Sequence, residues 1–147
     1  MQDTTHPEVL GVFSPVGHVV ASFPTQQDME GAAAELGQQG FATDKIVRFS
    51  PAEMKAQAEL DLDRASPLAE LGYEVKLVRA HRELAEKGYS FLMVHAPKGE
   101  QTQLVAEVAS RFHAERAQKY GNFAIEELIT PVAEEDHVVG TPAKGRA

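Results

Sequence analysis

Residues 17–40 read GHVVASFPTQQDMEGAAAELGQQG, and residues 88–121 read GYSFLMVHAPKGEQTQLVAEVASRFHAERAQKYG. Each stretch begins with an apolar run that suits a buried strand, passes through a proline, and continues with apolar residues at helical spacing. In the first stretch Met29, Ala33 and Leu36 lie on one helical face. Because the unit occurs twice, the sequence predicts an α+β sandwich in which helices pack against one sheet.

The segment between the two strand-and-helix units predicts a pair of helices. Residues 46–49 read as a short apolar strand. Ser50 and Glu53 then have the spacing of a capping box, and Ser66 begins a second helix-start signal of the same kind. Residues 51–87 are therefore expected to form two helices, inserted where a short hairpin connection usually lies.

The second unit continues with a helix predicted over residues 100–119, and residues 123–129 predict the last strand. Without the inserted helices, the element order is the ferredoxin-like βαββαβ pattern. We expect an α+β, ferredoxin-like sandwich with a two-helix insertion between the second and third strands. Residues 9–130 form a single domain in this interpretation, after a flexible N-terminus at 1–8. The polar residues from 131 to 147 predict a disordered tail.

Composition excludes several classes of function. The chain has 147 residues, enough for one domain with its own core. It has no cysteine, which excludes disulfides and thiolate sites, and its net charge of −8 opposes binding to a phosphate backbone. No apolar stretch approaches the roughly 20 residues that span a bilayer. We expect a cytoplasmic protein with no membrane partner, and nucleic acid is not an expected partner.

Two histidines are the main candidates for chemistry. In a ferredoxin-like sheet the first and third strands are antiparallel neighbours, which brings His18 beside His95. The later part of the last strand, with Glu126 and Glu127, is expected at the same end. Two imidazoles and a carboxylate can hold a metal or a small anion. The alternative, which the sequence favours, is a pair of partly buried histidines at a sheet edge or dimer interface, with no resident metal or cofactor.

A third interpretation is RNA binding through the open sheet face. Residues 87–94, KGYSFLMV, resemble the aromatic third-strand motif of RNA-recognition domains. The first strand offers no partner aromatic, and the net charge has the wrong sign for RNA. On the inserted helix, Arg79, His81 and Arg82 alternate with acidic residues, which predicts a solvent-exposed face.

Several stretches carry a family resemblance. They are residues 65–69 (ASPLA), 77–85 (LVRAHRELA), 88–97 (GYSFLMVHAP), 113–121 (HAERAQKYG) and 125–128 (IEEL). Together they resemble small bacterial proteins similar to general-stress, heat-induced stress-protein-like domains. The resemblance implies a bacterial, stress-associated protein. It transfers no catalytic residue.

The resemblance points to Tyr120, Glu126 and Glu127 as a feature of the type. Combined with the fold, it predicts a non-enzymatic, stress-associated binding or regulatory module that forms a homodimer. Phe91 and Met93 are too apolar to leave in water, so either the inserted helices or a second subunit must cover their face of the sheet. The competing function is a ligand- or metal-binding domain or a small enzyme. The candidate ligand-face residues are His18, Phe91, Met93, His95, Tyr120, Glu126 and Glu127.

Overall fold

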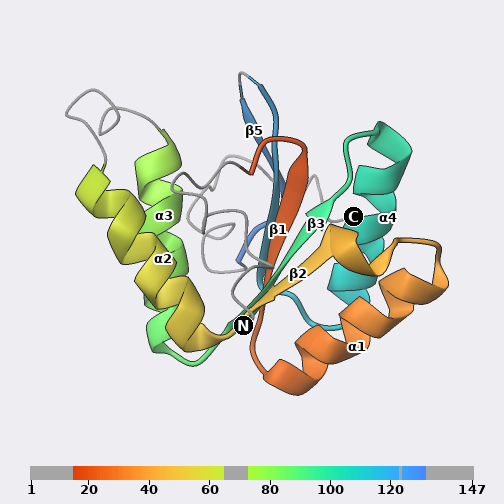
Figure 1. Cartoon of the computed structure of the whole chain (residues 1–147), viewed down its shortest axis with the longest axis horizontal. Coiled ribbons are helices and arrows are strands. Elements are labelled where there is room, and N and C mark those ends of the chain that lie inside the picture. The colour runs from red at the N-terminus through yellow and green to blue at the C-terminus, as the bar shows by residue number, and fades with distance from the viewer. Residues whose placement is uncertain (1–14, 65–72, 123, 132–147) are drawn as a thin grey trace.

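The computed structural model describes residues 15–64, 73–122 and 124–131. These residues build three layers, with a sheet between two pairs of helices (Figure 1). The strands are β1 (His18–Phe23), β2 (Ile46–Phe49), β3 (Ser90–His95), β4 (Arg116–Tyr120) and β5 (Ile125–Ile129). The helices are α1 (Gln26–Gln38), α2 (Pro51–Arg64), α3 (Tyr73–Glu86) and α4 (Gly99–Arg111), with a short 3-10 turn η3 (Thr43–Lys45) before β2.

The predicted α+β class is confirmed, and all neighbouring strands of the sheet are antiparallel, in the order β2-β3-β1-β4-β5. The central pairing of β1 with β3 sets His18 opposite His95 and Val20 opposite Met93. Edge strand β2 pairs with β3 so that Phe49 lies opposite Phe91. The chain therefore leaves the sheet after β2, forms α2 and α3, and returns to the sheet as β3, the neighbour of β2.

The prediction for residues 100–129, one long helix followed by the last strand, is wrong in part. The helix expected over residues 100–119 stops at Arg111, and residues 116–120 form β4, which takes the place beside β1 expected for the last strand. The helix ends because His113 adopts a left-handed conformation with φ of 71°, and Ala114 N–H returns to the carbonyl of Ala109 at 3.0 Å. The strand predicted at 123–129 is found as β5 (Ile125–Ile129), which lies at the sheet edge beyond β4.

One face of the sheet is covered by α1 and α4 (Figure 1). Val19, Ala21 and Phe23 of β1 point to this side and are buried. Alternation along a strand sends every second side chain to the same face, which explains why these three share it. They pack with buried residues of neighbouring elements, namely Met29, Ala32, Ala33, Leu36, Leu92, Val94, Val105, Val108, Ala109 and Ala117.

The opposite face is covered by α2 and α3 of the same chain (Figure 1). Val20, Phe91 and Met93 on the strands form a second core there with buried helix residues Met54, Leu77, Leu84 and Ala85. The inserted helices thus cover the apolar sheet face that a second subunit would otherwise have to cover. The reason for expecting a homodimer, an uncovered apolar sheet face, does not apply to this structure.

Local signals in the sequence account for the helix starts. The hydroxyl of Thr25 accepts a hydrogen bond from the N–H of Asp28 at 3.0 Å, which caps α1. Before α2, Glu53 N–H donates to the Ser50 hydroxyl at 3.0 Å, and Ser50 N–H donates to the Glu53 carboxylate at 2.9 Å. This is the predicted capping box. The start signal at Ser66 lies outside the described residues.

The expected N-terminal segment and nearly all of the expected tail also lie outside the described residues, since the structure omits residues 1–14 and 132–147. Over the described ranges, none of the helices has both the length and the apolar character needed to cross a bilayer.

Candidate functional site

The two predicted histidines meet at one end of the central strand pair. His18 and His95 lie opposite each other in the register of β1 and β3, and their ring centroids are 4.9 Å apart with an interplanar angle of 58°. His18 Nδ1 lies 3.1 Å from the carbonyl oxygen of Val16. A carbonyl oxygen can only accept a hydrogen bond, so Nδ1 of neutral His18 carries the proton. Nε2 then carries the lone pair that can accept a hydrogen bond.

The charge state of His18 is set by its surroundings. Burial lowers the pKa of His18, the hydrogen bond to Val16 partly opposes this, and the nearby His95 and Lys45 lower the pKa further. Burial and the positive charge of Lys45 therefore both favour the neutral form of His18.

Gly17 holds the turn that leads into this end of the sheet. Its φ of +84° is a conformation that L side chains rarely adopt, and its carbonyl accepts from Ala96 N–H at 3.0 Å. A Cβ at this position would lie 3.8 Å from Nε2 of His95. The His95 ring is therefore packed against a backbone that only glycine can form without strain.

His95 lines an open pocket of about 660 Å³. The pocket lies where three segments meet: the end of α1 with the turn after it, η3, and the first turn of α4. Its lining residues are Gln39, Gly40, Phe41, Ala42, Lys45, His95, Pro97, Lys98, Glu100, Gln101 and Leu104. The ligand-binding alternative expects both histidines to point into a cleft; His95 lines this pocket, and His18 is not among its described lining residues.

The pocket lining combines cations with an apolar wall. Among the described residues, neither Lys45 nor Lys98 forms a salt bridge with a carboxylate. Phe41 and Leu104 are partly buried against the core beneath and supply apolar surface. Of the lining residues that the structure describes, Glu100 is the single acidic one. The arrangement offers two ammonium groups and an imidazole next to an apolar patch.

A chain of hydrogen bonds fixes the segment that carries Lys98. Lys119 of β4 donates from Nζ to the hydroxyl of Thr102 at 2.7 Å. That hydroxyl in turn donates to the carbonyl of Ala96 at 3.0 Å or of Lys98 at 3.1 Å. Lys98 N–H donates to Oε1 of Gln101 at 3.0 Å. The wall of the pocket at the start of α4 is therefore held in place by buried contacts below it.

The structure separates the other candidate residues from the histidine pair. Phe91 and Met93 are fully buried and Tyr120 is 6% exposed, and all three belong to the second core rather than to a ligand face. Phe91 cannot stack on a base while α2 and α3 cover it. Among the described residues, RNA binding through this face therefore has no exposed aromatic platform.

The predicted carboxylates lie two strands from His18. Glu126 and Glu127 are on β5, and β4 separates β5 from β1, a distance of roughly 10 Å between strands. Glu126 is exposed and pairs in register with Lys119, while Glu127 lies within 3.6 Å of the guanidinium of Arg116. Within the ranges that the structure describes, no three His, Cys, Asp or Glu residues are grouped to hold a metal ion.

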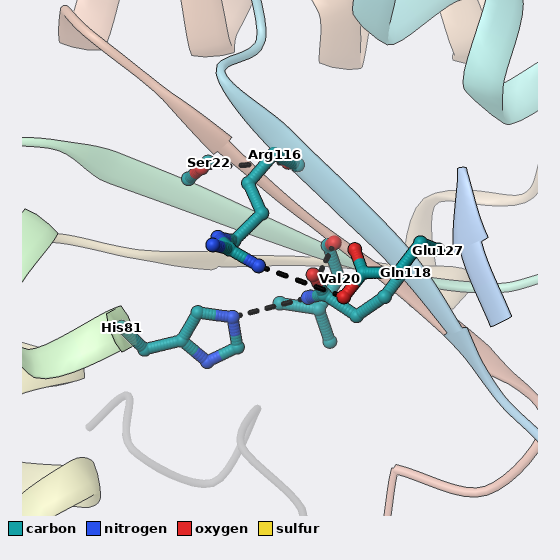
Figure 2. A network of polar contacts seen from close by, with 6 residues as sticks. All are labelled: Val20, Ser22, His81, Arg116, Gln118 and Glu127. Atoms are coloured by element: carbon teal, nitrogen blue, oxygen red, sulfur yellow. Dashed lines mark hydrogen bonds and ion pairs between the residues drawn. The ribbon is translucent and has the colours of Figure 1, made fainter. Parts of the chain in front are cut away.

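A second polar cluster lies between α3 and the sheet, and the grouping of its residues was not predicted from the sequence. Figure 2 shows His81 of α3 reaching toward Gln118 of β4, beside Arg116 and Glu127. The side-chain amide of Gln118 donates from Nε2 to the carbonyl of Val20 at 3.0 Å and lies 3.0 Å from Nε2 of His81. Gln118 is completely buried. We call His81, Arg116, Gln118 and Glu127 the buried polar cluster.

His81 is neutral in this cluster. Burial lowers its pKa to about 3, and the positive charge of Arg116 adds to the effect. Because the Gln118 amide N–H can only donate, Nε2 of His81 accepts and the ring proton is on Nδ1. The expectation that residues 79–82 form a solvent-exposed face is wrong for His81, which is 6% exposed.

A signal for His81 was present in the sequence. Leu77, His81 and Leu84 follow the i, i+4, i+7 spacing of one helical face, so His81 lies on the apolar stripe that α3 turns to the sheet. No comparable signal indicated that Gln118 is buried, because the sequence does not distinguish a buried glutamine from an exposed one in a strand of polar residues. The tertiary structure alone brings these residues together.

No family model, curated protein or solved structure matches this chain. Its function must therefore be argued from its own residues.

Proposed function

We propose that this chain is a small-molecule-binding module whose binding site is the pocket between α1, η3 and α4. The observation that carries the proposal is the pocket itself, which His95 lines together with two lysines and an apolar wall. Its volume, about 660 Å³, lies within the range of known ligand sites. A dimeric module without a ligand would need no such cleft, and the covered second face removes the main reason for a dimer.

A binding role is favoured over a catalytic one by the chemistry of the lining. The described pocket residues include no serine, threonine or aspartate, and the two lysines are exposed side chains at the surface. These groups can attract and orient a ligand, but they do not form a nucleophile held by a base. The module fits the stress-associated, cytoplasmic regulatory role suggested by the sequence, with ligand binding as its input.

We also propose that the fold is a ferredoxin-like sandwich extended by β5. Three features support this: β1 and β3 are paired at the centre, α1 and α4 lie on one face, and α2 with α3 interrupt the connection between β2 and β3. In such a frame the pocket lies at the end of the central strands, where loops from both strand-and-helix units meet.

The test is a fragment screen followed by NMR, with a variant that fills the pocket. Ala42→Trp places a large side chain in the lining from an exposed position, and Ala34→Trp adds the same side chain on the exposed face of α1. We expect fragments that shift the signals of His95 and Leu104 in the native chain and in Ala34→Trp, and no such shifts in Ala42→Trp. Fragments that still bind Ala42→Trp equally well would place the site elsewhere.

A further inference from the structure

We propose that the ligand of this pocket is an organic anion, a carboxylate or phosphate monoester attached to a compact apolar group. The inference rests on the proposed function and specifies its ligand. Lys45 and Lys98 would face the anionic end, His95 would lie beside it, and Phe41 with Leu104 would contact the apolar end.

The net charge of the pocket lining has the opposite sign to the net charge of the chain. Acidic residues outnumber basic ones by 22 to 14 in the whole protein. In the pocket lining the ratio is reversed, with Lys45 and Lys98 against Glu100. A local excess of positive charge on an acidic protein concentrates anions at that place and repels cations.

The lysines of the pocket are also available. Some basic side chains elsewhere on the surface are paired with carboxylates, such as Arg48 with Glu30 at 3.0 Å and Lys55 with Glu86 at 3.8 Å. Lys45 and Lys98 have no such partner among the described residues. Both ammonium groups can therefore turn to a ligand without breaking an existing ion pair.

The field at the histidine pair has the same sign. The positive charge of Lys45 acts on His18 and lowers its pKa. An anion bound next to His95 would offset this effect. His18 would then take up a proton more readily as the ligand binds, which strengthens the attraction.

The apolar wall argues for more than an inorganic ion. Phe41, Leu104 and Pro97 contribute lining that a free phosphate would leave in contact with water. A pocket of about 660 Å³ is far larger than a single oxyanion needs. An aromatic or short aliphatic group next to the charge would bury this surface and gain free energy from its removal from water.

The experiment compares matched ligands at the pocket. Benzoate, phenyl phosphate, benzamide and inorganic phosphate are titrated into the native chain, and binding is followed by the NMR signals of His95 and Leu104. We expect benzoate or phenyl phosphate to bind at least about tenfold more tightly than benzamide and than inorganic phosphate. Which of the two anions binds better distinguishes a carboxylate from a phosphate ligand.

Two charge-matched variants test the role of the lysines. Lys45→Gln with Lys98→Gln removes both pocket cations, and Lys76→Gln with Lys87→Gln removes two exposed cations of α3 and the turn after it. We expect the first pair to weaken benzoate or phenyl phosphate binding by about tenfold or more, and the second to change it by less than about twofold. Equal effects of the two pairs would overturn the proposal.

The outcomes separate this inference from the function on which it rests. If benzamide binds the pocket as tightly as benzoate and phenyl phosphate, the site is real but its ligand is not an anion. If inorganic phosphate matches phenyl phosphate, the apolar part of the proposal is overturned. If no ligand or screened fragment shifts the pocket signals, both the proposed binding function and the proposed anionic ligand are overturned.

Discussion

The two faces of the sheet are covered by helices in different ways. Toward α1 and α4, the contact is mainly apolar, as with Phe23 and Val108, and also includes the hydrogen bond from Lys119 to Thr102. Toward α2 and α3, an apolar core adjoins the buried polar cluster, in which His81 meets Gln118. The first face forms mainly through hydrophobic periodicity. The second also needs correctly placed donors and acceptors, so its stability depends on the protonation state of one ring.

The largest expected effect comes from removing one phenylalanine on each face. Phe23 and Phe91 are both fully buried, on the first and second face respectively. We expect Phe23→Ala and Phe91→Ala each to lower the free energy of unfolding by about 3–5 kcal/mol, measured by urea denaturation.

Hydrogen exchange would sharpen the comparison between these two variants. Phe91→Ala should speed amide exchange in α2 and α3 before it does so in α1 and α4, because its ring packs edge-on against His81 at 5.6 Å beneath the inserted helices. Equal acceleration in all four helices would show that the two faces unfold as one unit.

Acid should weaken the second face more than the first. The pKa of His81 is lowered from 6.5 to about 3 in the folded chain, so the unfolded chain binds a proton that the folded chain refuses. The contribution of His81 to stability is complete above pH 6.5 and is lost as the pH falls from 6.5 toward 3. Between pH 7 and pH 4.5 we expect a loss of about 2–3 kcal/mol from this residue.

The measurement is urea denaturation at both pH values for three chains. His81→Leu should be less stable than the native chain at pH 7 but should show a smaller loss on acidification. His113→Gln, at a side chain that is 73% exposed and pairs with Asp28, is the control and should keep nearly the native pH dependence. An unchanged pH dependence in His81→Leu would contradict a neutral, buried His81.

The smallest effect tests how closely the first face is packed. In α1 a Cβ added at Gly31 would lie 2.6 Å from Cε2 of Phe112, while one at Gly37 would have no atom within 4 Å. Alanine at Gly37 should raise the free energy of unfolding by up to about 1 kcal/mol through helix propensity. Alanine at Gly31 should lower it by about 1 kcal/mol, because the Phe112 ring must move.

Thermal denaturation of both single variants provides the measurement. A gain in melting temperature for Gly31→Ala equal to that for Gly37→Ala would mean that Phe112 yields freely, and that the contact between α1 and α4 is looser than the structure indicates.

Residues that act locally were predictable from the sequence. Thr25 and Ser50 cap their helices through partners three residues away, so the signal and the contact lie in one short segment. The meeting of His18 and His95 required one inference about strand order, which proved right for the central pair. The faces of β1 and β3 followed from simple alternation.

The features that the sequence did not predict share a different cause. Residues 116–120 read as the end of a helix because Arg116 and Gln118 are polar, yet both are buried in β4. The helix stops at a histidine in a left-handed conformation, where the usual glycine signal is missing. The pocket was also invisible to local reasoning, since Phe41, Lys45 and Lys98 converge only after the whole sheet has formed.

The pairing of Phe49 with Phe91 gives the chain a modular design. The segment between these two residues leaves and rejoins the sheet at a single place, and its helices α2 and α3 also bury Phe49, Phe91 and Met93. A lineage could exchange that segment without altering any strand register, provided that the new segment still covers these three side chains. The pocket, built from segments on the other side of the sheet, would be carried along intact through such changes.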